Sequence, residues 1–303
     1  MKFLPTTKEE MKSLGWDSID VLLISGDTYL DTSYNGSALV GKWLVEHGFK
    51  VGIIAQPEVD VPDDITRLGE PNLFFAISGG CVDSMVANYT ATKKRRQQDD
   101  FTPGGENNKR PDRAVLVYSN MIRRFFKGTT KKIVISGIES SLRRITHYDY
   151  WTNKLRKPIL FDAKADILSY GMGEMSMLQL ANALKNGEDW QNIRGLCYLS
   201  KEPKEDYLSL PSHSDCLADK DKFIEAFHTF YLNCDPITAK GLCQKCDDRY
   251  LIQNPPSESY SEEIMDKIYS MEFARDVHPY YKKMGAVRAL DTIKYSVTTH
   301  RGC

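Results

Sequence analysis

The sequence predicts an α/β fold in which a parallel sheet is flanked by helices. Over residues 1–200, short apolar runs alternate with amphipathic stretches, which is the pattern of successive βαβ units. Several of these runs end in glycine turns, as strands that lead into helices do in such sheets. Hydrophobic residues make up 41% of the chain and charged residues 27%, as in a globular protein with a substantial core.

Each predicted strand is a short apolar run bounded by turn residues. In chain order, the strands are expected at residues 20–26, 51–55, 73–78, 114–118, 132–136 and 166–170. The predicted helices have apolar residues at three- and four-residue spacing, and the first stops at Gly48, a typical C-terminal cap. They are expected at residues 36–47, 121–126, 175–184, 223–232 and 264–273, and residues 247–256 are expected to be extended.

The pattern divides the chain into three parts. Residues 1–200 form the predicted sheet domain, which a long polar loop at 93–112 interrupts. The alternation fades after Asp189, so residues 201–290 are predicted to be a mostly helical connecting region. Residues 291–303 contain the β-branched run Val297-Thr-Thr and are predicted to open a further domain with its first strand.

Charge, hydropathy and cysteine usage exclude several classes of protein. The formal net charge is −1, which gives no general attraction to nucleic acid or to an anionic membrane. No apolar run approaches the roughly 18–20 residues of a membrane-spanning helix, and the first residues lack a secretory leader. The seven cysteines are an odd number scattered along the chain, unlike a disulfide framework. A cytoplasmic location and no membrane partner are therefore expected.

The basic run Lys93-Lys-Arg-Arg96 is the one candidate for nucleic-acid binding. Asp99 and Asp100 follow closely and partly neutralise it, and no aromatic residue is interleaved for base stacking. A solvated loop is the preferred interpretation, and nucleic acid is not an expected partner.

Four predicted strand ends carry small residues in tight turns, where a parallel sheet places its ligand crevice. Helix N-termini at this edge offer free N–H groups to polar ligand groups. None of the turns fits a dinucleotide or phosphate-loop motif, so common nucleotides are disfavoured. The alternative is that the glycines serve only the turns. The candidate cofactor-binding residues are Gly26, Gly79, Gly80, Gly137, Glu139, Ser140, Gly171, Gly173 and Glu174.

Two further segments carry reactive side chains. Residues 140–151 are dense in polar and aromatic groups, in which His147 and Asp149 are candidates to orient one another and Arg143 or Arg144 to hold an anion. A structural or docking role is the alternative. Cys243-Gln-Lys-Cys246 has zinc-ligand spacing, but no second pair follows in the usual window. A structural role is preferred for both cysteines.

Motifs along nearly the whole chain resemble the YgiQ-type radical S-adenosylmethionine (SAM) proteins, and their N-terminal domain in particular. The matching stretches are Phe3-Leu-Pro-Thr-Thr-Lys-Glu-Glu-Met, Gly52-Ile-Ile-Ala-Gln-Pro57, Asp83-Ser-Met-Val, Lys93-Lys-Arg-Arg, Phe101-Thr-Pro-Gly-Gly105, Arg110-Pro-Asp-Arg-Ala114, Gly137-Ile-Glu-Ser-Ser-Leu-Arg-Arg144, His147-Tyr-Asp-Tyr-Trp151, Lys164-Ala-Asp166, Tyr170-Gly-Met-Gly-Glu174, Asp248-Arg-Tyr-Leu-Ile-Gln-Asn-Pro-Pro256 and Ser296-Val-Thr-Thr-His-Arg-Gly-Cys303.

The resemblance implies a [4Fe–4S] cluster and SAM as cofactors of the full-length protein. In the family, the segment like 296–303 continues into Cys-x-x-x-Cys-x-x-Cys, whose three thiolates hold the cluster. By this resemblance Cys303 is the first metal ligand, and the other two ligands lie beyond the sequence. The full-length enzyme would make a 5′-deoxyadenosyl radical, with an electron donor such as flavodoxin or ferredoxin. This chain by itself is expected to be inactive.

The resemblance also refines the expected fold. It implies a Rossmann-like, cobalamin-binding-like N-terminal domain, followed by the linker and the first strand of a truncated radical SAM barrel. Cobalamin is a candidate cofactor, although the Asp-x-His-x-x-Gly motif that supplies a cobalt ligand is absent. The alternatives are a non-catalytic ligand-binding or docking module and a domain of an RNA-modifying enzyme. The substrate is not readable from the sequence.

Overall fold

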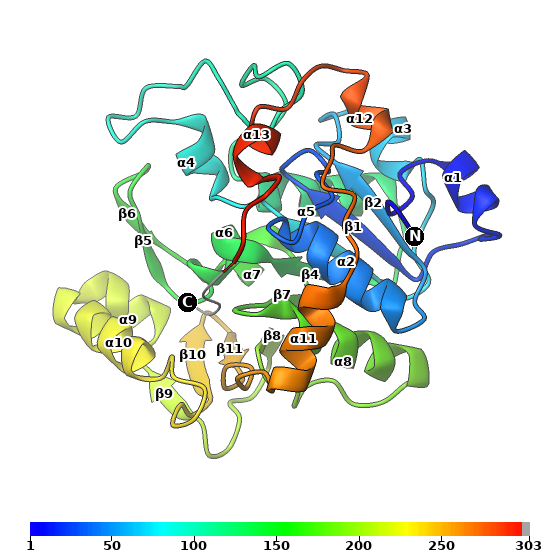
Figure 1. The fold of residues 1–303 in the computed structure, drawn as a ribbon. Helices are drawn as coiled ribbons and strands as arrows, with labels where there is room; N and C mark the ends of the chain where they lie inside the picture. Colours follow the sequence, from blue (N-terminus) through cyan, green and yellow to red (C-terminus); the bar gives the residue numbers. More distant parts are fainter. Residues whose placement is uncertain (299–303) are drawn as a thin grey trace.

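A computed structural model describes residues 1–298 of the chain. Its fold is mixed α/β, with one large sheet and helices on both faces (Figure 1). The sheet strands are β1 (Val21–Ser25), β2 (Val51–Ala55), β3 (Phe74–Ser78), β4 (Lys132–Ser136), β7 (Ile167–Ser169), β8 (Leu196–Ser200), β9 (Leu208–Leu210), β10 (Leu242–Cys246) and β11 (Arg249–Gln253). Strands β5 (His147–Asp149) and β6 (Lys154–Arg156) form a separate hairpin.

Helices account for most of the remaining regular structure. They are α1 (Lys8–Ser13), α2 (Gly36–Glu46), α3 (Pro62–Thr66), α4 (Ser84–Asn88), α5 (Ala114–Phe125), α6 (Gly137–Ser141), α7 (Ile159–Ala163), α8 (Gly173–Asn186), α9 (His213–Ala218), α10 (Lys220–Leu232), α11 (Glu262–Ser270), α12 (Pro279–Lys282) and α13 (Ala289–Ile293). None of the helices in residues 1–298 is long and apolar enough to cross a membrane.

Five parallel strands, in the order β2-β1-β3-β4-β7, form the first part of the sheet. Side chains alternate between the faces of each strand, so Leu22 and Ile24 of β1 pack into the cluster that contains α5 and α7. Val21 and Leu23 pack into the cluster that contains α2 and α8. Burial on both faces explains why these strands appear in the sequence as continuous apolar runs.

The second part of the sheet corrects the prediction for residues 201–290. This region contains helices α9 to α12, including the helices predicted at 223–232 and 264–273. It is not only a linker, because it also supplies β9, β10 and β11 to the same sheet, where β8 and β11 pair antiparallel. Strand β11 lies within residues 247–256, which were predicted to be extended. Strand β10 was not predicted because it buries the polar Gln244, whose amide group bonds Thr146 N and Pro211 O. The division of the chain into domains stays a prediction.

Two other predicted strands differ from the structure. The apolar run 114–118 is the first part of helix α5, because Val115, Tyr118 and Ile122 recur at helical spacing and are buried on one side. Residues 294–298 leave α13 as a turn and irregular chain, without a strand partner among the described residues. The remainder of that predicted strand, with Cys303, lies outside the described residues.

Residues 271–298, which we call the C-terminal strap, run from α11 past α12 and α13 over the amino-terminal half (Figure 1). The strap bonds to the loop after β1, where Leu30 and Val277 form an antiparallel bridge and His278 N donates to Tyr29 O at 3.0 Å. Ala289 N also donates to Asp100 O at 2.9 Å. The strap therefore holds loops at the carboxyl edge of the sheet.

Candidate functional site

The carboxyl ends of β1, β3, β4 and β7 lie along one edge of the sheet, so the predicted glycine turns come together as expected. In a doubly wound sheet, the ligand crevice lies where successive crossovers leave in opposite directions, here between β1 and β3. A Cβ on Gly26 would lie only 2.1 Å from the carbonyl oxygen of Gly79. The two turns therefore approach each other backbone to backbone at this point.

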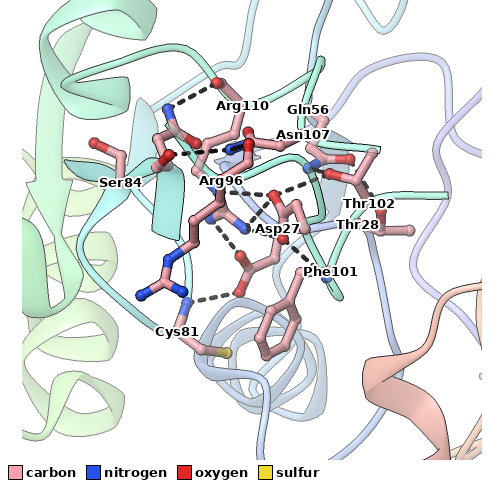
Figure 2. Close-up of polar contacts among 12 residues, drawn as sticks. Asp27, Thr28, Gln56, Cys81, Ser84, Arg96, Phe101, Thr102, Asn107 and Arg110 are labelled. Carbon is pink, nitrogen blue, oxygen red and sulfur yellow. Dashed lines mark hydrogen bonds and ion pairs between the residues drawn. The ribbon is translucent and has the colours of Figure 1, made fainter. Parts of the chain in front are cut away.

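The side chain of Arg110 occupies the position between these turns (Figure 2). It is 0% exposed, and its Nη1 donates to Asp27 Oδ1 at 2.5 Å and to Gly79 O at 2.9 Å. Its Nε and Nη2 donate to Asp99 Oδ2 at 3.2 and 3.1 Å. Burial alone would lower the pKa of Arg110, but the carboxylates of Asp27 and Asp99 outweigh it and raise that pKa. The guanidinium is thus a fixed buried charge.

Asp99 and its neighbours extend this network towards β2. Asp99 accepts from Phe101 N and from Thr102 Oγ1, each at 3.0 Å. Thr102 Oγ1 in turn accepts from Gln56 Nε2 at 2.7 Å, and Gln56 Oε1 accepts from Thr28 Oγ1 at 3.0 Å (Figure 2). Asp99, Thr102 and Arg110 of the loop 93–112 are therefore folded into the edge, and the longest continuous exposed stretch here is residues 91–98.

Asp27, Asp99 and Arg110 are not among the site residues predicted from the sequence. The available signal was an aspartate directly after a buried strand, in Ser25-Gly26-Asp27. A corrin or nucleotide group at the β1/β3 position would have to displace Arg110 and leave Asp27 and Asp99 buried without their cation, which is costly. The residues at the β1/β3 position do not fit such a group. Cobalamin binding by the protein stays a prediction.

Glu139 lies beside this network and joins two helix starts. Its Oε2 accepts from Ser84 N at 2.9 Å and its Oε1 from Val115 N at 3.2 Å, so it bonds the first turns of α4 and α5. The side chain is almost fully buried, next to Ser140. Burial and the nearby carboxylate of Asp83 raise the pKa of Glu139. The geometry is that of a structural acceptor for two helix N-termini.

The substitution Glu139→Gln tests this role through the pH dependence of stability. Because the folded-state pKa is raised above 4.5, Glu139 contributes stability at low pH that is lost as the pH rises through the folded pKa. Glutamine does not titrate, so the variant should lack this decline. Its amide nitrogen cannot accept, so we also expect a loss of about 1–2 kcal/mol in the free energy of unfolding.

Urea unfolding at a series of pH values measures both effects. The matched control is Glu46→Gln, at the exposed end of α2, for which we expect the pH profile of the parent. The same change of profile in both variants would contradict the assignment to Glu139.

The turn after β7 is closed by a residue from the segment before α11. Tyr260 OH donates to Glu174 Oε2 at 3.0 Å, and Glu174 is buried at the start of α8. Gly171 and Gly137 have positive φ angles of 73° and 80°, which glycine adopts without strain. At these two positions the glycines are required by the turns themselves. Whether any of the predicted edge residues also binds a cofactor stays a prediction.

The polar segment 140–151 does not bring His147 and Asp149 into contact. Burial lowers the pKa of His147 to about 4, and its Nδ1 bonds Ile145 O at 3.1 Å. Burial alone would raise the pKa of Asp149, but hydrogen bonds from Thr152 and Arg113 outweigh it and lower that pKa to about 2. Each side chain is thus held by its own structural partners.

The two candidate anion-binding arginines are also engaged within the protein. Arg143 forms an ion pair with Asp83. The guanidinium of Arg144 lies between the rings of Tyr170 and Phe230, with its carbon 4.5 and 4.3 Å from their centroids. Both arginines therefore link elements of the fold, which agrees with the structural alternative.

Cys243 and Cys246 do not fit a zinc site. They are three positions apart on β10, so their side chains project to opposite faces of the sheet. Burial raises the pKa of both thiols, to about 11 for Cys246. Residues 1–298 contain no group of three or more His, Cys, Asp or Glu side chains placed to hold a metal ion.

The fold and this edge define a mixed α/β domain with a large, mostly parallel sheet whose crevice is closed by its own side chains. Residues 3–296 match the family model described as "Radical SAM N-terminal", and the chain belongs to that family. It is 97% identical to a UPF0313 protein of Fusobacterium nucleatum over its whole length, and 50% identical to a UPF0313 protein of Thermotoga neapolitana over 99% of its length. The chain spans 53% of each, about half their length.

Two solved structures of the radical SAM methyltransferase TsrM from Kitasatospora setae are less similar to this chain. One holds tryptophan and a SAM analogue. The alignment covers 59% of this chain and 28% of the TsrM chain, at 16% identity and a TM-score of 0.39. The other holds cobalamin and a [4Fe–4S] cluster. This alignment covers 60% of this chain and 27% of the TsrM chain, at 16% identity and a TM-score of 0.40. Similarity at this level assigns no ligand to the chain.

Proposed function

We propose that the full-length protein is a radical SAM enzyme in which this chain is the N-terminal domain and Cys303 is the first ligand of a [4Fe–4S] cluster. The observation that carries the proposal is the family match over residues 3–296, followed by the His300-Arg-Gly-Cys303 segment. When bound, the cluster would hold SAM and supply the electron that cleaves it to a 5′-deoxyadenosyl radical. An electron donor of the flavodoxin or ferredoxin type and a cytoplasmic location follow from this chemistry.

Within that enzyme, the described residues would act as a non-catalytic body that positions the strap. Asp31, which is 0% exposed, accepts from Lys42 Nζ at 2.8 Å and from Ala274 N at 2.6 Å. Lys42 Nζ also donates to Glu272 O at 2.5 Å. These bonds hold the start of the strap to the first βα unit, and the strap leads towards Cys303. Arg110 fills the crevice of the sheet, which supports a positioning role for this part of the protein.

Anaerobic reconstitution of the full-length protein with iron and sulfide tests the proposal. We expect a brown protein with about four iron atoms per chain that cleaves SAM to 5′-deoxyadenosine once reduced. Cys303→Ala should lose most of the bound iron and the cleavage activity. Cys234→Ala is the control, because Cys234 is a free cysteine in the described part of the chain, and it should keep both. Equal iron contents in the two variants would overturn the assignment of Cys303.

A further inference from the structure

Two segments that are far apart in the sequence, the loop after α4 and hairpin β5–β6, lie side by side. The basic run Lys93-Lys-Arg-Arg96 follows α4, and the aromatic residues Tyr148, Tyr150 and Trp151 belong to the hairpin and its turn (Figure 1). Tyr150 OH donates to Ala91 O at 2.6 Å, and Lys93 Nζ donates to Trp151 O at 3.2 Å. These bonds fix the hairpin against the loop, and we call the joint surface the basic–aromatic surface.

Rings and cations alternate across this surface. Lys93 Nζ lies 4.7 Å from the centroid of Tyr150, and the guanidinium carbon of Arg95 lies 5.7 Å from that of Tyr89. The Tyr89 and Trp151 rings are 5.3 Å apart, and Trp151 and Tyr150 are 5.4 Å apart at 77°. Tyr150 is 48% exposed, which leaves part of its ring open to a stacking partner.

The charge of the surface is positive. Residues 91–98 are all exposed, and Asp99, which the sequence places beside the basic run, is buried against Arg110. Asp112 pairs with Arg95 at 3.5 Å, and Asp100 pairs with Arg288 at 3.5 Å. Within residues 1–298, Lys94 forms no ion pair. Asp99 and Asp100 are therefore paired with arginines outside the run, and Asp112 is the acidic residue that pairs with a member of it, Arg95.

We infer that the basic–aromatic surface binds single-stranded nucleic acid. Exposed cations along the loop suit the phosphates of the backbone, and the exposed ring of Tyr150 suits an unpaired base, the combination by which proteins bind single strands without reading sequence. From the sequence, a solvated loop was preferred to this partner because Asp99 and Asp100 follow the run and no aromatic residue is interleaved with it. The fold supplies the aromatic residues from 148–151, buries Asp99 and pairs the exposed Asp100 with Arg288, and these contacts favour the surface as a binding site. This inference does not depend on the cluster.

Fluorescence polarisation with the full-length protein and labelled oligonucleotides tests the inference. We expect saturable binding of oligouridine or of oligothymidine, and comparing the two shows whether RNA or DNA is preferred. A duplex should bind much more weakly, because its bases are already stacked. Lys94→Glu should weaken binding on the order of tenfold and reduce the slope of log affinity against log salt by about 0.7, the value for one phosphate contact on a single strand.

Changes to the ring of Tyr150 should alter the affinity for the oligonucleotide but not the slope of log affinity against log salt. Tyr150→Ala should weaken binding by about tenfold with an unchanged salt slope, and Tyr150→Phe, which keeps the ring, should retain most of it. The controls are Lys201→Glu, beyond the opposite edge of the sheet, and Tyr231→Ala, on the exposed side of α10. Absence of binding would overturn the inference, as would equal losses in Lys94→Glu and Lys201→Glu.

Discussion

Replacing Arg110 with methionine should lower the free energy of unfolding by about 3–5 kcal/mol, the usual cost of removing one partner from a buried ion pair. The cost is high because Asp27 and Asp99 would remain buried, at 0% and 5% exposure, without the cation that both contact. The Gly79 carbonyl would also lose a donor. Urea unfolding of the 303-residue chain, followed by circular dichroism, measures the loss.

An exposed pair of the same chemistry provides the control. Arg124 pairs with Asp60, and their side chains are 62% and 69% exposed. Pairs in water contribute about 0–1 kcal/mol, so Arg124→Met should change stability little. Similar losses in the two variants would contradict the view that the Asp27–Arg110–Asp99 network holds the carboxyl edge together. If Arg110→Met does not fold, Asp99→Asn, which keeps the shape and the hydrogen-bonding oxygen, gives a milder test with the same sign.

The parallel part of the sheet could be predicted because its strands are buried on both faces. The cores of these strands, such as residues 21–24 and 133–135, are apolar without interruption and are followed by turn residues, so local pattern and tertiary environment agree. The run at 114–118 was misassigned because a short apolar stretch fits a buried strand and a buried helix equally well. Its continuation to Ile122 at helical spacing decides the outcome.

The candidate site could be predicted only in outline. Parallel topology brings the predicted turns to one edge, but the contents of that edge depend on contacts between distant residues. Arg110 comes from a polar loop, and it meets Asp27 across 83 positions of sequence. In the sequence, such charged residues are typical of a solvent-exposed loop, because only the fold shows that they are buried. The same holds for Lys93 and Tyr150, whose proximity depends on where hairpin β5–β6 folds.

Gly26→Ala is expected to destabilise the chain by about 3 kcal/mol or more, at or above the upper end of ordinary overpacking. The added Cβ would lie 2.1 Å from Gly79 O and 2.6 Å from Gly79 C, both backbone atoms that cannot turn aside as a side chain can. The turns after β1 and β3 would have to separate, which weakens the Gly26 N–Ser78 O bond of 2.9 Å and the contacts of Arg110 with both turns. Thermal and urea unfolding measure the effect.

Gly36→Ala, ten residues later, is the matched control. Its added Cβ would have nothing within 4 Å, and it lies at the start of α2, where alanine favours the helix. It should be neutral or slightly stabilising. If both glycines tolerate alanine, the turns after β1 and β3 are not in close contact. The view that Arg110 fills the remaining space between these two turns would then be wrong.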